Sequence, residues 1–257
     1  MPSIKGEKFV YSRNSKHPNM SDERPIIEFI DVDINNSDTL VIEKLNLVVH
    51  EGDFVYITGK VGSGKTSIIR SIIGENYISG DTARVGDFNL LTIKNKQIPY
   101  LRRYLGIVFQ DFQLLMDRTI HDNLEFVLKA TGWKKGPEME ERISEVLKQV
   151  GMETKSHKMP HQLSGGEQQR IAIARSLLNK PGIILADEPT GNLDNETALS
   201  IMDLIQRINK EDKTAIVMVT HNQHLIKQYP GRVFVCGNSQ CREVVNSDTE
   251  IDLDLDF

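Results

Sequence analysis

The chain has 257 residues, of which 39 % are hydrophobic, and its 31 basic and 36 acidic side chains give a formal net charge of −5. This length suffices for a substantial core, and one domain with a subdomain fits better than two full domains. The acidic balance gives no reason to expect a nucleic-acid surface. Because the apolar runs are far shorter than the ~20 residues of a membrane helix, we expect a cytoplasmic protein that reaches a membrane only through a partner.

Both ends of the chain are polar. Residues 1–25 are rich in Lys, Arg, Ser, Asn and Pro and lack the apolar segment of a secretory signal. They are predicted to be a disordered tail, with docking to a partner or to an anionic lipid as the alternative. Residues 247–257 alternate acidic residues with Ile, Leu and Phe, which predicts an acidic tail or a partner-binding peptide. The folded domain is expected between these ends, over residues 26–246.

The spacing of apolar residues predicts strands and helices that alternate along the chain. The predicted strands are Ile26–Asp33, Leu40–Val49, Phe54–Thr58, short strands within Asp81–Leu91, Leu105–Phe109, Ile183–Ala186, Thr214–Thr220, and a closing hairpin of Arg232–Cys236 with Arg242–Val245. The predicted helices are Ser67–Ile73, Ile120–Ala130, Pro137–Val150, Glu167–Asn179 and Ala198–Ile208. We therefore expect an α/β fold with a mostly parallel sheet, an antiparallel layer, and a helical subdomain inserted at about 111–165.

Two cysteines, Cys236 and Cys241, flank a Gly-Asn-Ser-Gln turn in the closing hairpin. A disulfide or a metal site is conceivable at this spacing. Two reduced thiols are favoured, because disulfides are rare in cytosolic proteins.

The stretch Gly59–Thr66 matches the pattern G-x-x-x-x-G-K-[ST], with an apolar strand before it and a helical pattern after it. Backbone N–H groups of such a loop cradle the α- and β-phosphates of a nucleotide. Lys65 would reach the β- and γ-phosphates, and the Thr66 hydroxyl would bind Mg²⁺. A glycine-rich turn that matches by chance is the alternative, and the strand and helix on either side disfavour it.

A second informative stretch runs from Leu163 to Asp194. Gly165 and Gly166 precede a helical pattern, so they are predicted to bring free N–H groups and a positive dipole end close to an anion. Asp187 and Glu188 follow four apolar residues and are therefore expected at the carboxyl end of a buried strand, the edge at which α/β sheets bind ligands. A solvated strand end is the alternative, and the four apolar residues directly before the two acids disfavour it.

Together these stretches resemble the nucleotide-binding subunit of ABC ATPases, from about Ile26 to about Val245. The signature Leu-Ser-Gly-Gly-Glu-Gln at 163–168 is specific to that superfamily. The resemblance implies a P-loop (RecA-like) core and ATP and Mg²⁺ as ligands. It makes Gln110 the Q-loop glutamine, Asp187 the Walker B aspartate, Glu188 the catalytic carboxylate and His221 the switch histidine. The D-loop is then Asn192–Asp194.

The resemblance also assigns roles at the site. The catalytic residues are Glu188, His221, Gln110 and Lys65, and the metal-binding residues are Thr66, Gln110 and Asp187. The nucleotide is held by Gly59, Lys60, Val61, Gly62, Ser63, Gly64, Lys65, Thr66 and Ser67 of one chain, and by Ser164, Gly165, Gly166, Glu167 and Asp194. In this architecture the second set comes from another copy, so the resemblance implies a head-to-tail homodimer with two ATP molecules that closes on ATP and opens after hydrolysis.

One position departs from the family pattern. An aromatic residue that stacks on adenine usually follows the first strand, and the matching position here is Asn35. Tyr11 lies too far upstream to fill that place easily. Since stacking is worth on the order of 1–3 kcal/mol per base, we expect weaker binding of the base, while phosphate contacts still suffice for binding.

The Q-loop region, Gly106–Thr119 with Leu101-Arg102-Arg103 before it, resembles the FtsE family of cell-division ATPases. Solute importers have a Phe-Pro-His-like segment where this chain has Met116-Asp117-Arg118. This resemblance implies an integral membrane partner like FtsX, contact with the inner face of the cell membrane through it, and activation of peptidoglycan hydrolases outside the cell. The alternatives are the ATPase of a lipoprotein-releasing or macrolide-type exporter, which shares the sequence at 186–194, and a non-hydrolysing, nucleotide-dependent scaffold.

The Q-loop region also contains a dense apolar set, and two interpretations of it remain open. The set consists of Phe112, Leu114, Leu115 and Met116. These side chains either belong to the subdomain core or, for some of them, line the groove that accepts the membrane partner. The groove is favoured because an exposed apolar patch normally marks an interface.

Overall fold

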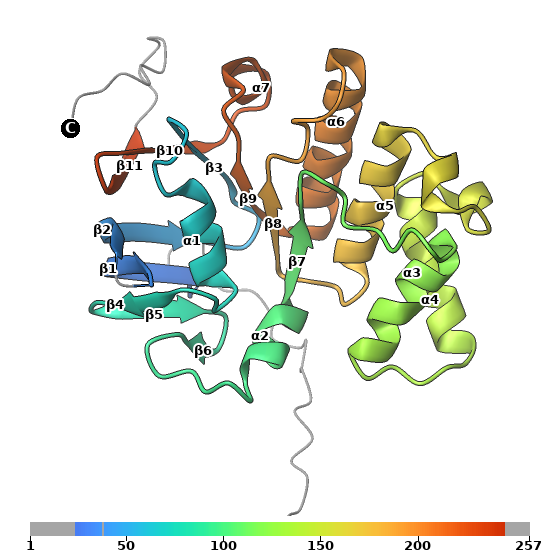
Figure 1. Cartoon of the computed structure of the whole chain (residues 1–257), viewed down its shortest axis with the longest axis horizontal. Helices are drawn as coiled ribbons and strands as arrows, with labels where there is room; N and C mark the ends of the chain where they lie inside the picture. Colours follow the sequence, from blue (N-terminus) through green and yellow to red (C-terminus); the bar gives the residue numbers. More distant parts are fainter. Residues whose placement is uncertain (1–23, 38, 245–257) are drawn as a thin grey trace, which may run out of the picture.

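The structure is a computed structural model that describes residues 24–37 and 39–244. Within these residues the centre is a six-stranded sheet in the order β11-β10-β3-β9-β8-β7, in which only β11 runs antiparallel to its neighbour. Its strands are β3 (Phe54–Gly59), β7 (Leu105–Val108), β8 (Ile183–Asp187), β9 (Ala215–Val219), β10 (Arg232–Gly237) and β11 (Gln240–Val244). The parallel strands end at one edge of the sheet, as the arrowheads of β7 and β8 show in Figure 1.

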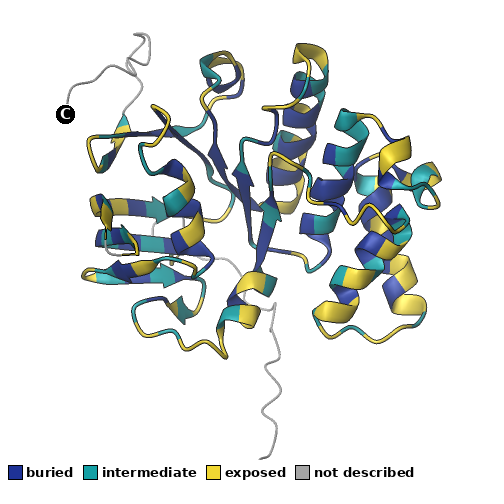
Figure 2. Ribbon diagram, viewed as in Figure 1, coloured by how far each residue is buried: buried dark blue, intermediate teal, exposed yellow. Residues whose placement is uncertain are grey.

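The parallel strands are buried on both faces, which explains their nearly continuous apolar sequences. Every residue of β9 is buried, and so are the first four residues of β8 (Figure 2). Alternate residues of β8 face different cores: Ile183 and Leu185 pack on one side of the sheet, and Ile184 and Ala186 on the other. The sheet therefore separates two hydrophobic cores.

An antiparallel sheet forms a second layer, in the order β2-β1-β5-β6 with β4 paired to the end of β1. Its strands are β1 (Ile27–Asn36), β2 (Thr39–Val49), β4 (Tyr77–Ser79), β5 (Thr82–Val85) and β6 (Phe88–Asn89). Helix α1 (Lys65–Ile72) shares one core with both sheets through Ile68, Ile69 and Ile72, which are fully or almost fully buried. Packing against both sheets thus fixes the position of α1.

Longer helices lie on the other side of the parallel sheet (Figure 1). They are α3 (Ile120–Ala130), α4 (Pro137–Gln149), α5 (Gly165–Leu177) and α6 (Asn195–Asp212), with 3₁₀ turns at Glu153–Lys155 and Pro160–Gln162. Helix α5 packs on β7, and α3 and α4 pack on α5. Within the described part of the chain, no helix combines the length and the apolar composition that crossing a bilayer requires.

This architecture confirms the predicted α/β class, with local differences. Helices α2 (Ile98–Tyr104) and α7 (Gln223–Gln228) were not predicted, because six or seven residues show too little periodicity. Strand β1 continues to Asn36 because β2 and β4 both pair with its last residues. Cys236 and Cys241 are buried free thiols that face each other across the β10–β11 hairpin.

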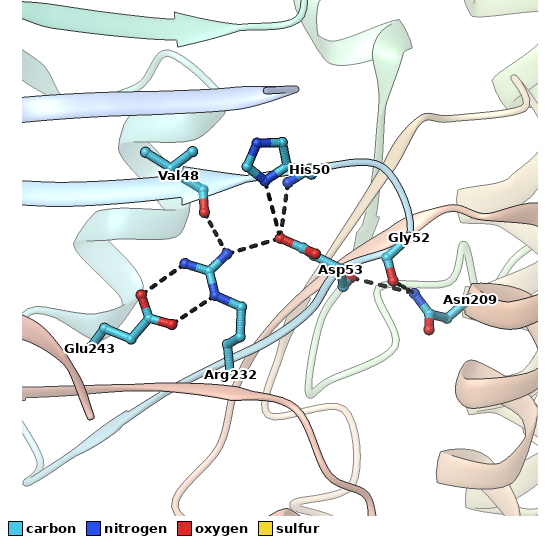
Figure 3. A network of polar contacts seen from close by, with 7 residues as sticks. All are labelled: Val48, His50, Gly52, Asp53, Asn209, Arg232 and Glu243. Atoms are coloured by element: carbon cyan, nitrogen blue, oxygen red, sulfur yellow. Dashed lines mark hydrogen bonds and ion pairs between the residues drawn. The ribbon is translucent and has the colours of Figure 1, made fainter. Parts of the chain in front are cut away.

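The two sheets are joined by a guanidinium group (Figure 3). Arg232 of β10 donates to the Val48 carbonyl of β2 at 2.6 Å and to the Asp53 carboxylate at 2.9 Å. Its other nitrogens form a two-pronged pair with Glu243 of β11, at 2.7 and 2.8 Å. The same segment is tied to α6, because the Asn209 amide donates to the Gly52 carbonyl at 2.9 Å. Such charge-assisted, geometrically fixed bonds are stronger than exposed ion pairs.

We predict that Arg232→Met lowers the free energy of unfolding by about 1–3 kcal/mol, because it leaves several acceptors without their donor. Arg232→Lys should recover only part of the loss, since an ammonium cannot span acceptors on three strands. Arg24→Met is the matched control: it breaks an exposed ion pair with Asp87 and should change stability by no more than about 0.5 kcal/mol. Urea unfolding measures all three, and equal losses in Arg232→Met and Arg24→Met would contradict the prediction.

A histidine connects α3 with α4. His121 Nε2 lies 2.8 Å from a carboxylate oxygen of Glu140, and Nδ1 lies 3.6 Å from Asp122. Burial opposes protonation of the imidazole, but the hydrogen bonds and charges of the two acids outweigh it and raise the His121 pKa above 6.5. The protonated form is therefore favoured by folding, so this stabilisation is complete below the unfolded-state pKa and is lost as pH rises through the folded-state pKa.

We predict that His121→Gln destabilises the protein at about pH 5.5 and has little effect at about pH 9. Thermal unfolding of both proteins across this range provides the measurement. A difference in midpoint that does not depend on pH would mean that packing, and not charge, is what His121 contributes.

Candidate functional site

The phosphate loop connects β3 with α1, and its glycines are required by close contacts and by backbone geometry. A Cβ atom on Gly59 would lie 2.1 Å from the Cys236 carbonyl oxygen of β10. A Cβ atom on Gly64 would lie 2.8 Å from the Ile42 side chain of β2. Both residues also have positive φ angles, 140° and 93°. The loop is therefore held at its two ends by different sheets.

The interior of this loop carries the groups that a phosphate needs. The Lys65 ammonium is largely buried and donates to the carbonyl oxygens of Gly59 and Lys60, both at 2.9 Å, so its charge lies within the loop. The Ser63 hydroxyl is buried and has no hydrogen-bond partner. At Gly62, a Cβ atom would meet nothing within 4 Å, which leaves the backbone approachable. An unpaired donor beside a buried cation fits an anionic ligand.

The first turn of α1 contacts the end of β8. The Thr66 hydroxyl acts on the Asp187 carboxylate and favours its charged form. Burial raises the pKa of Asp187 above its ordinary value, and the Thr66 hydroxyl opposes this effect only in part. Among the described residues no cluster of three or more His, Cys, Asp or Glu could hold a metal ion. One carboxylate with one hydroxyl, completed by water and phosphate oxygens, fits Mg²⁺, which retains several of its waters in proteins.

Glu188 and His221 lie side by side, although 33 positions separate them in the sequence. His221 Nδ1 lies 2.7 Å from a Glu188 carboxylate oxygen. The Glu188 N–H donates to the Val219 carbonyl at 2.9 Å, and the chain leaves the sheet at this residue because β8 ends at Asp187. Glu188 has a φ of 48°, which is uncommon for a residue other than glycine and is often found at functional sites. Both side chains are accessible to water and to a ligand.

Gln110 lies beside the D-loop after the end of β7. Its side-chain amide donates to Asn192 Oδ1 at 3.2 Å, and the Asn192 amide donates back to the Gln110 carbonyl at 3.1 Å. A Cβ atom on Gly191 would lie 2.9 Å from the Gln110 amide nitrogen. The Q-loop and the D-loop are thus in direct contact.

The signature segment begins α5 with a reciprocal cap. The Ser164 hydroxyl accepts from the Glu167 N–H at 3.3 Å, and the Glu167 carboxylate accepts from the Ser164 N–H at 2.9 Å. Lys155 is paired with Glu167 at 3.2 Å. The backbone hydrogen bond lowers the pKa of Glu167, so the cap stays charged. The Ser164 hydroxyl lies at the exposed start of α5 and can serve as a donor to a ligand.

The two signature glycines differ in what they contact. A Cβ atom on Gly166 would lie 2.4 Å from the Thr197 methyl carbon of α6, whereas one on Gly165 would lie 3.4 Å from Leu193. Thr197 is fixed because Asp194, the N-cap of α6, accepts from its N–H at 3.0 Å and from its hydroxyl at 2.6 Å. Gly166 is therefore needed for helix packing, a role that the sequence did not reveal because it depends on a distant residue.

The structure brings some of the predicted residues together and keeps others apart. Lys65, Thr66 and Asp187 are in contact, and the Glu188–His221 pair lies at the ends of the neighbouring strands β8 and β9. The signature helix lies on the other side of β7 and β8 from α1 (Figure 1). Asn35 pairs with Leu40 on one side and with the exposed Tyr77 on the other, while Tyr11 lies outside the described residues.

A phosphate-binding loop, an acidic strand end and a capped glycine-rich helix on one parallel sheet define a P-loop nucleotide-binding protein. The sequence model of the ABC transporter family matches residues 42–191. The chain belongs to this family and is an ATPase.

Two curated relatives have similar sequence identities to this chain. The cell division ATP-binding protein FtsE of Mycobacterium tuberculosis is 42 % identical over 193 residues, which cover 75 % of this chain and 83 % of that protein. The methionine import ATP-binding protein MetN of Clostridium tetani is 40 % identical over 210 residues, covering 81 % of this chain and 65 % of its own length. The chain is thus similar to FtsE over most of both proteins.

A solved structure gives the same picture of the fold. The ATP-binding cassette MJ0796, determined as a dimer in a post-hydrolysis state with ADP and Pi, superposes with a TM-score of 0.72 at 31 % identity. The superposition covers 86 % of this chain and 99 % of that one.

The packing role of Gly166 leads to a prediction. Gly166→Ala should lower the unfolding midpoint, because the new methyl group must displace Thr197 or α6. Adding Thr197→Ser removes the obstructing methyl carbon but keeps the hydroxyl bonded to Asp194. The double variant should therefore be at least as stable as Thr197→Ser alone. It should gain up to about 1 kcal/mol, the difference in helix propensity between Ala and Gly. Gly165→Ala, whose new methyl would make an ordinary contact, is the control. Calorimetry of the four variants tests this, and the absence of rescue would contradict it.

Proposed function

We propose that the chain is the ATP-hydrolysing subunit of an FtsEX-like complex, in which ATP-driven closure of a homodimer acts on an integral membrane partner like FtsX. The observation that carries this proposal is the 42 % identity to FtsE over 83 % of that protein's length. The chemistry within one chain is supported by the contacts among Lys65, Thr66, Asp187, Glu188 and His221.

Hydrolysis requires a held terminal phosphate and a water molecule aimed in line with the bond that breaks. Lys65 and the N–H groups of residues 59–67 hold the phosphates. Thr66, Asp187 and Gln110 would hold Mg²⁺, which would supply positive charge to the phosphate oxygens. Glu188 accepts a hydrogen bond from the attacking water and takes up its proton. His221 is 2.7 Å from Glu188, so it orients this carboxylate and can donate to the γ-phosphate.

The signature segment supplies the second half of each site from the other copy. Within one chain, α5 and α1 lie on different sides of the sheet, so Ser164, Gly165 and Gly166 have no nucleotide of their own to bind. A head-to-tail dimer places them, with Glu167 and Asp194, against the γ-phosphate held by the partner. The dimeric form of MJ0796 supports this arrangement. ATP then favours the closed state because it contacts both chains.

Glu188→Gln tests the dimer directly. This variant should bind ATP without hydrolysing it and should therefore accumulate as a dimer in Mg–ATP, whereas the unaltered protein should be largely monomeric with ADP. Light scattering after gel filtration measures the mass. A second variant that adds Ser164→Arg should bind ATP but stay monomeric, because it blocks only the partner's half-site. A monomeric Glu188→Gln protein at saturating ATP would overturn the closure mechanism.

The docking surface for the membrane partner is proposed at the helical segment that follows the Q-loop. Leu114 is buried in the core, while Leu115, Met116 and Phe126 are exposed. The guanidinium of Arg118 lies 5.0 Å from the centre of the Phe126 ring. Arg118 and Phe126 line a hollow of about 270 Å³ with Asp122, Glu125 and Lys129. Exposed apolar side chains at 115, 116 and 126, beside a hollow lined mainly by charged residues, fit a protein contact better than a solvated surface.

Affinity capture from solubilised native membranes identifies the partner. Glu188→Gln protein in Mg–ATP should retain an FtsX-like membrane protein, and Met116→Asp should weaken the capture by at least about tenfold through an unpaired charge in the contact. Tyr100→Asp, at an exposed aromatic residue outside this surface, is the control. Recovery of a lipoprotein-releasing or macrolide-type permease would assign the chain to that exporter group, and capture of no membrane protein would favour a soluble scaffold.

A further inference from the structure

The segment directly after Gln110 has an unusual backbone. Phe112 and Gln113 have φ angles of 58° and 49°, so two consecutive residues that are not glycine occupy the left-handed region. The Gln113 N–H donates to the Asp111 carbonyl at 2.6 Å, which closes a tight turn. L-residues adopt such a turn only when surrounding contacts hold it.

Arg175 supplies these contacts from α5. Its guanidinium donates to the Phe112 carbonyl at 2.9 Å and to the Gln113 carbonyl. The charge of Asp111 acts on the same guanidinium. A planar fork with fixed donors suits two adjacent carbonyl groups, whereas a lysine ammonium is a single point charge. Among the described residues, Arg175 is the side chain that donates to both carbonyls of the turn.

The turn lies between two parts of the candidate site. On one side it continues from Gln110, which is bonded to Asn192 of the D-loop. On the other side, the Phe112 ring lies 3.8 Å from where a Cβ atom of Gly165 in the signature would be. Arg175 is ten residues from Gly165 on the same helix, about 15 Å along its axis. One rigid helix therefore carries both the signature and the group that holds the Q-loop turn.

We propose that Arg175 is a positioning residue for hydrolysis, which holds the Phe112–Gln113 turn so that Gln110 stays at the nucleotide and moves together with the signature helix. The proposal rests on the role proposed above for Gln110. Arg175 does not contact the phosphate loop residues or Glu188; its effect on the reaction passes through the main chain of the turn.

The test compares two arginines of α5. Arg175→Gln should lower kcat for ATP hydrolysis by about tenfold or more while KM changes less than about twofold, because misplacing Gln110 affects the reacting geometry and not the phosphate contacts. Arg170→Gln is the matched control: Arg170 donates to the Val150 carbonyl and to Ser200, away from the Q-loop. It should lower the unfolding midpoint and leave kcat per folded molecule unchanged.

Rescue variants keep the test decisive if Arg175→Gln is poorly stable. Arg175→Lys should recover part of kcat through one carbonyl. Gln113→Gly, at an exposed side chain, adopts positive φ without strain, so adding it to Arg175→Gln should restore kcat toward the value of Gln113→Gly alone. Equal kcat losses with and without this glycine would overturn the proposal.

A double-mutant cycle with Gln110 separates this proposal from the proposed function. If Arg175 acts through Gln110, then Arg175→Gln should add little to the loss in kcat caused by Gln110→Ala. A loss in kcat of the double variant that equals the product of the two single losses would refute the role of Arg175 and leave that of Gln110 intact. If Gln110→Ala itself hydrolyses ATP at the unaltered rate, the catalytic role proposed for Gln110 fails and the inference about Arg175 fails with it.

Discussion

The interaction between Thr66 and Asp187 joins the two stretches on which the candidate site depends. It exists because β3 and β8 run parallel, with β9 between them, and so end at the same edge of the sheet. The apolar side chains of these strands are buried on both faces of the sheet, and close packing in the core leaves the strands little freedom to shift. A polar side chain can then act on a residue that is more than a hundred positions away in the sequence. Glu188 and His221 also lie at this edge, because they come just after the neighbouring strands β8 and β9.

Local sequence contains most of this site because its parts are continuous in the chain. The phosphate loop, the acidic end of β8 and the capped start of α5 each lie within about ten residues, and turn chemistry or helix capping dictates their shapes. The same holds for the long helices, whose apolar spacing gave their positions to within a few residues. The helices of six or seven residues are too short to show that spacing, and tertiary packing decides them.

Contacts between distant elements were not readable from the sequence. Gly59 and Gly166 are both required because a side chain would not fit at either position. A Cβ atom would meet a carbonyl of β10 at Gly59 and a methyl group of α6 at Gly166. A glycine-rich pattern does not say which neighbour excludes a side chain, because that depends on two elements that meet only in the folded chain. The positive φ of Glu188, at the point where the chain leaves β8, was likewise not readable from the sequence.

Arg232 has a mechanical consequence. By bonding to β2, to the start of β3 and to β11, it makes the antiparallel layer and the parallel sheet resist shear against each other, so they respond to force as one stiff body. The chain leaves this body after β7 to form α3 and α4 and returns to it through α5. Force that enters at the exposed side chains of 115–126 therefore reaches the sheet through these two covalent connections and through the packing of α5 on β7.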